Sequence, residues 1–435
     1  MNYTPIFPSR LQARVMLPAS KSISNRAMLL CALSGAMSSV EHMATCDDTY
    51  VMWRALSERS KVIDIQAAGT AMRFLTAYFA ICSGEEHILT GTERMCQRPI
   101  APLVQSLRAL GANVSYVERE GFPPLYIRGC RLDGGDLCVT SDVSSQYISA
   151  LLMIAPAMKQ GLTLTLRGPI ISRPYIEMTL SMMRSAGAVA QWVAPNVVRV
   201  EPGSYVDGKI FHVESDWSAA SYWYSMVALS PDPAARVALR QLDRESLQGD
   251  AAVQHYFRPL GVATTFDEDH QEVVLTKCDV LPEEAREVYR LNLVNQPDLA
   301  QTLVVACAML RRPFRFEGLR SLRIKETDRM EALRAELAKF GFELGIGDDN
   351  VLSMDRFPAA DDLLYMTQIP ASAPHWDGRP IATYHDHRMA MAFAPAALIC
   401  PGFSIADPEV VSKSYPDFWK DIEALSGEPT PTVAP

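Results

Sequence analysis

The 435-residue chain lacks several patterns that would assign it to a particular environment. Its nine cysteines are odd in number and form no C-x-x-C pair, so neither disulfides nor a zinc site are expected. No apolar stretch precedes Arg10, and we therefore expect no signal peptide. Residues 389–406 carry no charge, but Pro395, Pro401 and Gly402 interrupt them, which is atypical of a membrane span. These absences predict a cytoplasmic protein.

The sequence also lacks an excess of positive charge. The net charge is −9 and the isoelectric point is near 5.5. Proteins that bind nucleic acid or acidic membranes usually carry a basic surface, so neither partner is expected. Any anionic ligand must then be small and bound in a local basic pocket. At this length, and with 48% hydrophobic residues, the chain is expected to form about two or three domains.

The most informative segment that is present spans residues 323–329 and reads Arg-Ile-Lys-Glu-Thr-Asp-Arg. Asp328 is a residue type that begins helices, and the apolar residues after it recur at helical spacing. Lys325 and Arg329 are four residues apart, so in a helical turn they would lie on one side, beside the carboxylate of Glu326. We interpret the segment as an anion-binding loop that leads into a helix, although a solvated run of charges is the common alternative. The apolar positions of the expected helix are Met330, Leu333, Leu337 and Phe340.

A second pattern occurs six times: a small polar, Gly or Asp residue precedes an apolar helix of about three turns. Each helix is apolar nearly all round, which is typical of a helix buried on every side. Short β-like runs and amphipathic second helices lie between them, so the sequence predicts two α/β domains of three repeated units each. Helix N-termini that face a common cleft would attract anions. The six apolar helices are expected over residues 27–33, 74–82, 147–158, 219–229, 299–310 and 389–400.

Nine motifs follow one another in a fixed order along the chain. They are Pro18 to Arg26 (Pro-Ala-Ser-Lys-Ser-x-Ser-Asn-Arg), Ala68 to Arg73 (Ala-Gly-Thr-Ala-Met-Arg), Gln97 to Ile100, Ser144 to Gln146, Ser172 to Tyr175, Pro297-Asp298, Lys325 to Arg329, Asp386 to Ala390 (Asp-His-Arg-Met-Ala), and Lys413. Together they resemble the 5-enolpyruvylshikimate-3-phosphate synthase family, over nearly the whole chain from about Leu17 to Phe418. The Lys-Glu-Thr-Asp-Arg and Asp-His-Arg-Met-Ala elements are the most specific of the nine.

The resemblance implies a fold of two inverse α/β-barrel-like domains, each built from three repeated βαβαββ-type units, with the active site between them. One lobe would span residues 19–214, the other residues 1–18 with 215–435, and the tail 427–435 would be disordered. The family transfers the enolpyruvyl group of phosphoenolpyruvate to the 5-hydroxyl of shikimate-3-phosphate and releases phosphate. This is the sixth step of the shikimate pathway to chorismate and the aromatic amino acids. The family uses no metal and no organic cofactor, and it is usually monomeric.

The resemblance also implies roles for individual residues, carried over position by position. Both substrates carry several negative charges, which Arg neutralises through two parallel hydrogen bonds and Lys as a point charge. The reaction needs a base for the hydroxyl proton, which suits Asp298, and an acid for the methylene carbon, which suits Glu326 with Lys21. The shikimate-3-phosphate contacts would be Lys21, Ser22, Arg26, Ser144, Ser145, Gln146, Ser172, Tyr175, Asp298, Ser321 and Lys325. The phosphoenolpyruvate contacts would be Lys21, Gly69, Arg98, Gln146, Arg329, Arg388 and Lys413. Arg73 and Arg173 also fall within the motifs.

At some positions the sequence departs from the family. Ala67 and Ser321 stand where the family usually has Asn, so one polar contact near phosphoenolpyruvate is lost and another is shortened. Phe74 replaces a common Pro. The segment between Asp48 and Gly69 is much shorter than usual, and we expect one helix and part of a hairpin to be missing from the first unit and the helix after Gly69 to be less firmly held. Residues 362–381 form a longer connection than usual.

Two other functions stay open. The related UDP-N-acetylglucosamine enolpyruvyl transferases share the fold and donor and use a Cys near this Arg-Pro motif, and Cys96 lies two residues before Arg98. A lone thiol is more often a packing residue, and the Lys-Glu-Thr-Asp-Arg and Ser-Ser-Gln motifs favour the shikimate enzyme. The other alternative is a non-catalytic anion-binding relative whose shortened first domain no longer closes. Five charged residues argue against it by their joint presence: Lys21, Asp298, Glu326, Arg388 and Lys413.

Overall fold

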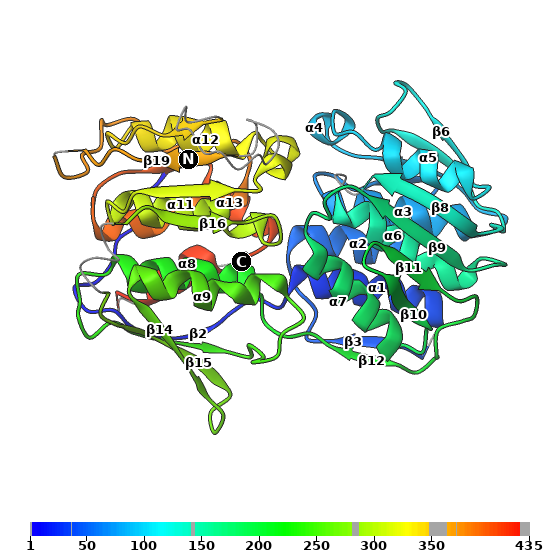
Figure 1. The fold of residues 1–435 in the computed structure, drawn as a ribbon, viewed down its shortest axis with the longest axis horizontal. Coiled ribbons are helices and arrows are strands. Elements are labelled where there is room, and N and C mark those ends of the chain that lie inside the picture. The colour runs from blue at the N-terminus through cyan, green and yellow to red at the C-terminus, as the bar shows by residue number, and fades with distance from the viewer. Residues whose placement is uncertain are drawn as a thin grey trace, which may run out of the picture. The chain divides into compact units, whose positions relative to one another are not determined.

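The computed structural model describes residues 2–35, 37–140, 144–280, 287–347, 363–370 and 372–426. The chain divides into two compact units (Figure 1). We refer to Ala19–Glu214 as the central unit and to Met1–Pro18 with Ser215–Pro435 as the terminal unit. The tail expected to be disordered, and part of the connection expected over 362–381, lie outside the described residues.

Three helices lie side by side in the interior of each unit (Figure 1). Most of their positions are buried, because apolar side chains occur on every face. The six buried helices predicted from the sequence are therefore confirmed. In the central unit they are α1 (Lys21–Ser34), α3 (Gly69–Ile81) and α6 (Ser145–Ile154). In the terminal unit they are α8 (Trp217–Leu229), α11 (Ala300–Met309) and α13 (His387–Phe393).

In its described part, the central unit has two four-stranded sheets and one two-stranded sheet. Burial alternates along β9 (Leu162–Arg167), as expected of a strand with one face on the core. The first sheet has the order β4 (Val62–Asp64), β5 (Glu86–Thr90), β7 (Leu125–Arg128), β6 (Asn113–Tyr116). The second has the order β10 (Ala190–Ala194), β11 (Val197–Val200), β9, β8 (Gly135–Thr140), and the third pairs β12 (Ile210–His212) with β3 (Ser39–Glu41). The remaining helices are α2 (Asp47–Glu58), α4 (Glu93–Cys96), α5 (Ala101–Ala109) and α7 (Arg173–Ser185).

The terminal unit has the same set of sheets among its described residues. Its first strand comes from the N-terminal segment, because β2 (Gln12–Met16) pairs in parallel with β13 (Arg236–Arg240). The first sheet has the order β14 (Val262–Asp267), β15 (Glu272–Lys277), β13, β2, and the second β16 (Tyr289–Asn292), β17 (Phe314–Glu317), β19 (Leu364–Met366), β18 (Gly345–Ile346). The third pairs β1 (Asn2–Tyr3) with β20 (Ile405–Ala406). Its other α-helices within the described residues are α9 (Val253–Phe257), α12 (Arg329–Ala338) and α14 (Phe418–Ala424).

The shortened first unit differs from the expectation in one respect. A helix does follow β3, since α2 spans Asp47–Glu58, so the expected loss of a helix is wrong. The sheet of this unit, β12 with β3, has two strands where the other two sheets of the central unit have four. The helix after it, α3, is buried over most of its length, which does not support the expectation that it is loosely held.

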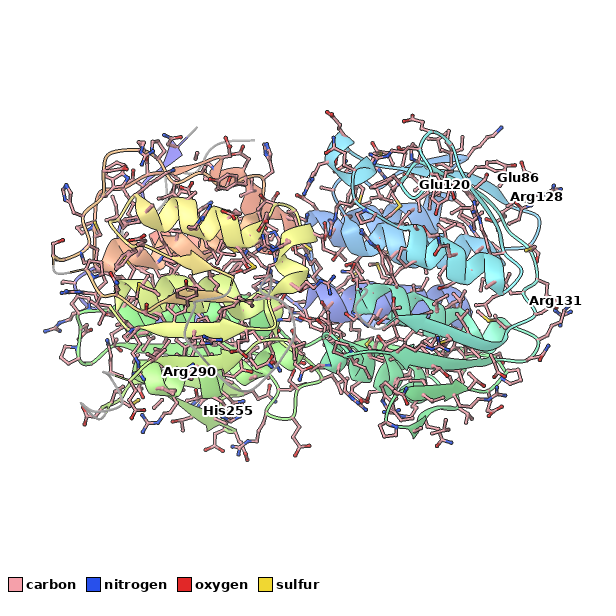
Figure 2. All side chains as sticks on the ribbon, turned by 45° about the horizontal axis from the view of Figure 1, so that its top comes forward. Glu86, Glu120, Arg128, Arg131, His255 and Arg290 are labelled. Carbon is pink, nitrogen blue, oxygen red and sulfur yellow. The ribbon has the colours of Figure 1, made fainter. Side chains whose placement is uncertain are left out.

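Each unit has its own hydrophobic core. Charged side chains such as Glu86, Arg128 and Arg290 lie outside these cores, as Figure 2 shows. Within the described ranges, we find no helix whose length and apolar character would let it cross a membrane. The two cores place the ends of the inner helices, and with them the charged motifs, at defined positions in each unit.

Candidate functional site

The Lys-Glu-Thr-Asp-Arg segment leads into helix α12 as predicted. Asp328 is the N-cap, and its Oδ1 accepts hydrogen bonds from the backbone N–H groups of Met330 (3.1 Å) and Glu331 (3.3 Å). Such a cap satisfies amides that would otherwise lack a partner at a helix start. The apolar stripe of the helix is buried, which fixes the side of α12 that faces the core. Its members are Met330, Leu333, Leu337 and Phe340.

Arg329, the first residue of α12, binds three carboxylates. Its Nε lies 2.6 Å from Asp386 Oδ2, its Nη1 3.0 Å from Asp298 Oδ1, and its Nη2 2.9 Å from Glu326 Oε2. The side chain is 2% exposed. A guanidinium presents its donors in a rigid planar fork, so it can orient several carboxylates at once. Arg329 therefore ties the segment before α12 to the starts of α11 and α13.

Three further cations complete this cluster in the terminal unit. Lys413 Nζ lies 3.0 Å from Glu326 Oε1, and Lys325 Nζ lies 3.4 Å from Asp298 Oδ1. Arg388 Nη2 lies 3.2 Å from Asp298 Oδ2, and its Nη1 donates to the Asp298 backbone carbonyl at 3.2 Å. Acids and bases therefore alternate around the N-terminal ends of α11 and α13.

The electrostatics of the cluster favour ionised carboxylates. Burial acts to raise the pKa of Asp298, but Arg388, Lys325 and Arg329 outweigh it and hold that pKa well below its usual range. Burial likewise acts to lower the pKa of Arg329, and the three carboxylates outweigh it and raise that pKa. Asp298 is therefore a carboxylate at neutral pH, and Glu326 lies between two cations, Arg329 and Lys413.

The central unit holds its buried arginine differently. Arg26 of α1 is 2% exposed, and its Nε donates to Thr179 Oγ1 at 2.7 Å. Its other donors reach Ser22 O (3.0 Å), Ser149 Oγ (3.3 Å) and Tyr175 O (3.4 Å). Burial lowers the pKa of Arg26 to about 10, and within the described part of the unit no carboxylate forms an ion pair with it. The guanidinium is thus fixed by neutral acceptors and keeps its positive charge unbalanced.

A second group of cations surrounds the start of α3. A Cβ placed on Gly69 would lie 3.0 Å from Arg98 Nη1 and 3.2 Å from Arg73 Nη1, so both guanidiniums approach the backbone there. Gln146 Nε2 donates to Thr70 Oγ1 at 3.1 Å, which joins the start of α6 to the start of α3. Helix N-termini and guanidiniums both favour an anion. The absence of a side chain at Gly69 keeps this position open.

The other expected site residues of the central unit also lie at helix starts. Lys21 begins α1, and its Nζ lies 3.1 Å from Asp48 Oδ2. Ser144 is the N-cap of α6, and its Oγ accepts from the Gln146 N–H at 3.3 Å. Ser172 is the N-cap of α7 with a left-handed backbone (φ 55°). The remaining three lie in the first turns of α1, α6 and α7: Ser22, Ser145 and Tyr175.

Some residues that complete these clusters were not expected from the sequence. Asp386 pairs with Arg329, although the sequence indicated it only as part of the Asp-His-Arg-Met-Ala motif. Asp48 pairs with Lys21, and the sequence indicated no role for it. Ser321 lies in the 3₁₀ segment Arg320–Ile324, where its buried Oγ has no hydrogen-bond partner in the described part of the chain. The Cys96 thiol donates to the Gly91 carbonyl (3.6 Å), a structural contact.

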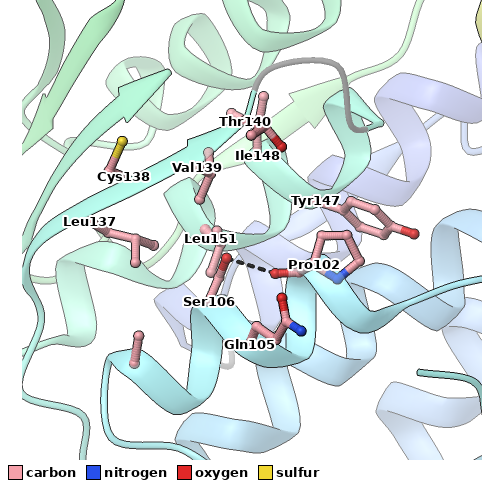
Figure 3. A pocket seen from close by; sticks show the side chains of 11 residues that line it. Pro102, Gln105, Ser106, Leu137, Cys138, Val139, Thr140, Tyr147, Ile148 and Leu151 are labelled. Atoms are coloured by element: carbon pink, nitrogen blue, oxygen red, sulfur yellow. Dashed lines mark hydrogen bonds between the residues drawn. The ribbon is translucent and has the colours of Figure 1, made fainter. Parts of the chain in front are cut away.

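A pocket of about 300 Å³ lies in the central unit (Figure 3). It is bordered by α5, β8 and α6, and Tyr147 lies at its edge. The Tyr147 hydroxyl donates to the Pro99 carbonyl at 2.5 Å, beside Arg98. None of the expected site residues is among the described residues that line the pocket. Its side chains are Pro102, Gln105, Ser106, Ala109, Leu137, Cys138, Val139, Thr140, Tyr147, Ile148 and Leu151.

Comparison with known proteins identifies the family. The model of the family EPSP synthase (3-phosphoshikimate 1-carboxyvinyltransferase) matches residues 7–59 and 56–422. A protein of Bacteroides fragilis (strain YCH46) named 3-phosphoshikimate 1-carboxyvinyltransferase is 50% identical over 422 residues, which is 97% of each chain. One of the same name from Shewanella sediminis is 32% identical over 448 residues, 96% of this chain and 98% of the relative. A solved EPSP synthase of Acinetobacter baumannii shares the fold with a TM-score of 0.73 over 98% of each chain at 19% identity, which confirms the fold class. The chain belongs to the EPSP synthase family.

Proposed function

We propose that this protein transfers the enolpyruvyl group of phosphoenolpyruvate to the 5-hydroxyl of shikimate-3-phosphate and releases phosphate. The observation that carries the proposal is the 50% identity, over 97% of both chains, to a protein named 3-phosphoshikimate 1-carboxyvinyltransferase. The charged cluster around Arg329 supports it, because the reaction needs both acids and bases close to anionic substrates.

The reaction has two stages, and each moves one proton in each direction. In the addition, the 5-hydroxyl oxygen bonds to the central carbon of phosphoenolpyruvate, the hydroxyl loses its proton and the methylene gains one. In the elimination, the new methyl loses a proton, the bond between the central carbon and the phosphate oxygen breaks, and the released phosphate takes up the proton that came from the hydroxyl. We assign the hydroxyl proton to Asp298, and the proton on the methyl to Glu326 with Lys21.

Substrate binding would itself prepare Asp298 to act as a base. In the unliganded cluster three cations hold its pKa low, and a carboxylate with so low a pKa is a weak base. A bound phosphate or carboxylate would draw Arg388, Lys325 and Arg329 toward itself and weaken their hold on Asp298. The pKa of Asp298 would then rise when the hydroxyl must be deprotonated.

The remaining site residues are proposed as binding groups in two sets. Those for shikimate-3-phosphate include Arg26, whose charge is not balanced by a carboxylate. Those for phosphoenolpyruvate include Arg98 beside Gly69, together with Arg388 and Lys413 of the terminal unit. We also propose that the protein is a monomer and acts in the cytoplasm. Gel filtration with light scattering measures its mass in solution and so tests the first of these.

Phosphate release tests the proposed function directly. Purified protein is given phosphoenolpyruvate with either shikimate-3-phosphate or UDP-N-acetylglucosamine, and Asp298→Asn and Glu326→Gln serve as controls. We expect phosphate release with shikimate-3-phosphate and none with UDP-N-acetylglucosamine. The rate of release should fall about a hundredfold or more in both variants. Release with the nucleotide sugar would assign the protein to the related transferase. Binding of both ligands without release would identify a non-catalytic relative.

A further inference from the structure

Asp250 is a buried carboxylate that lies outside every motif of the proposed site. It belongs to the 3₁₀ turn Gly249–Ala252, which packs beside the start of α8, and it is 1% exposed. Its Oδ2 accepts a hydrogen bond from the Ser218 hydroxyl. Its Oδ1 is buried and has no hydrogen-bond partner in the described ranges. A buried carboxylate held by one hydroxyl is costly, so its presence calls for a reason.

Ser218 connects Asp250 to the proposed catalytic carboxylate. The Ser218 Oγ accepts from Arg388 Nη2 at 3.4 Å, and the same Nη2 lies 3.2 Å from Asp298 Oδ2. A serine hydroxyl has one proton and two lone pairs. While that proton is donated to Asp250, the lone pairs of Ser218 face the guanidinium and hold it.

We propose that Asp250 is a positioning residue that, through Ser218, holds the Arg388 guanidinium against Asp298; this inference rests on the proposed function. Protonation of Asp250 would allow the carboxyl group to donate to Ser218. The Ser218 proton would then turn toward Arg388 and repel it. The charge of Asp250 thus determines whether Arg388 stays in place.

The surroundings of Asp250 set the pH at which this change occurs. Burial and then the charge of Asp298 raise the pKa of Asp250 to about 6, against the opposing effects of Arg388 and the Ser218 hydrogen bond. Asp216, the N-cap of α8, also raises it, and Tyr256 of α9 interacts with it electrostatically. The folded protein therefore binds this proton more tightly than the unfolded chain does. Burying ionised Asp250 therefore lowers the free energy of unfolding by its full amount above about pH 6. This cost disappears as the pH falls toward the pKa of an ordinary aspartate.

The test is Asp250→Asn, with Asp269→Asn, in an exposed turn, as the matched control. At pH 7.5 we expect kcat to fall roughly ten- to hundredfold because Arg388 and Asp298 lose their alignment. When kcat/KM is plotted against pH, the unmodified protein should lose activity below about pH 6 as Asp250 gains a proton, and this loss should be absent in the variant. The melting temperature should stay level or rise, because a desolvated charge has been removed. A residue with only a structural role would instead lower the melting temperature and leave the pH profile unchanged.

Ser218→Ala provides a second test if Asp250→Asn does not fold. It should reproduce the loss of kcat, and the double variant should lose no more than either single variant. Infrared difference spectroscopy of the unmodified protein should show a carboxylic acid band that titrates near pH 6, whether or not the protein turns over. Loss of that band in Asp250→Asn supports the inference. The inference about Asp250 would be overturned if Asp250→Asn turned over as fast as the unmodified protein and kept the acid limb of its pH profile. If the unmodified protein released no phosphate, only the proposed function would be overturned.

Discussion

The two units of this protein bury an arginine in opposite ways. In the terminal unit, Arg329 contacts three carboxylates within 3.0 Å. In the central unit, Arg26 is held by hydroxyls and backbone carbonyls, and no carboxylate pairs with it among the described residues. Both side chains are almost fully buried.

The difference indicates a division of labour in the proposed reaction. A cluster of alternating acids and bases can move protons, because each group can exchange a proton while its neighbours compensate the charge. An arginine with unbalanced charge is instead prepared to receive an anion. We therefore expect the terminal cluster to govern turnover and folding, and Arg26 to govern affinity.

Arg329→Met should produce the largest effect on stability. The change leaves three carboxylates near one another without their shared cation, and we expect the free energy of unfolding to fall by about 3–5 kcal/mol. Urea denaturation measures the loss, and hydrogen–deuterium exchange should locate it in α12 and α13. Arg334→Met on the exposed face of the same helix is the control, and its effect should stay below about 0.5 kcal/mol. A similar loss in both variants would mean that helix α12, and not the paired charges, decides the result.

Glu336→Gln tests a second buried carboxylate of the terminal unit. Its Oε2 binds Lys339 Nζ (2.5 Å) and the Ala382 N–H (2.9 Å), and its Oε1 accepts from the Tyr384 hydroxyl at 2.7 Å. These bonds hold Tyr384 and the next residue, which have left-handed φ angles of 54° and 55° just before the N-cap of α13. We expect a loss of about 1–3 kcal/mol in thermal or urea unfolding.

The control for this change is Glu331→Gln, also in α12 but with a side chain that is 44% exposed. It should cost less than about 0.5 kcal/mol, because an exposed pair is well solvated. Equal effects of the two substitutions would contradict a specific role for the buried contacts of Glu336.

Arg26→Met separates affinity from stability in the central unit. Hydrogen bonds are lost but no carboxylate is left unpaired, so the free energy of unfolding should fall by only about 1–2 kcal/mol. Affinity for shikimate-3-phosphate, measured by isothermal titration calorimetry, should fall roughly a hundredfold because the buried charge that receives the phosphate is gone. A loss of stability as large as that of Arg329→Met, or unchanged affinity, would remove the contrast between the two units.

The sequence predicted what local signals encode. Asp328 caps helix α12, and the helix buries its apolar stripe; both features follow from a capping residue and a periodic pattern. Two of the three carboxylates on Arg329 could not be predicted from local sequence, since Asp298 and Asp386 are 31 and 57 residues away. Asp250 likewise acquires its neighbours only through the fold.

The helix α2 was wrongly expected to be missing because the expectation relied on the length of the segment and not on its pattern of apolar residues. The segment before Gly69 was short, and a helix was expected to be missing. Its residues Val51, Met52 and Ala55 have helical spacing and are buried on one face of α2. The two acidic residues at its start, Asp47 and Asp48, also favour a helix N-terminus. The periodicity therefore predicts the helix correctly.

Arg128→Ala should have the smallest effect, and it tests whether burial explains the contrast between the units. Arg128 of β7 lies opposite Glu86 of β5, with 3.4 Å between Nε and Oε1, and the two side chains are 63% and 45% exposed (Figure 2). An exposed pair gains little over solvation by water and is screened by salt, so the cost should stay below about 0.5 kcal/mol and shrink further at high ionic strength. The measurement is urea denaturation at low and high salt. A cost of more than about 1 kcal/mol would mean that ion pairs stabilise this protein whether or not they are buried, and Arg26 would then be an isolated exception. A negligible cost would mean that burial is the property that makes the carboxylates around Arg329 indispensable.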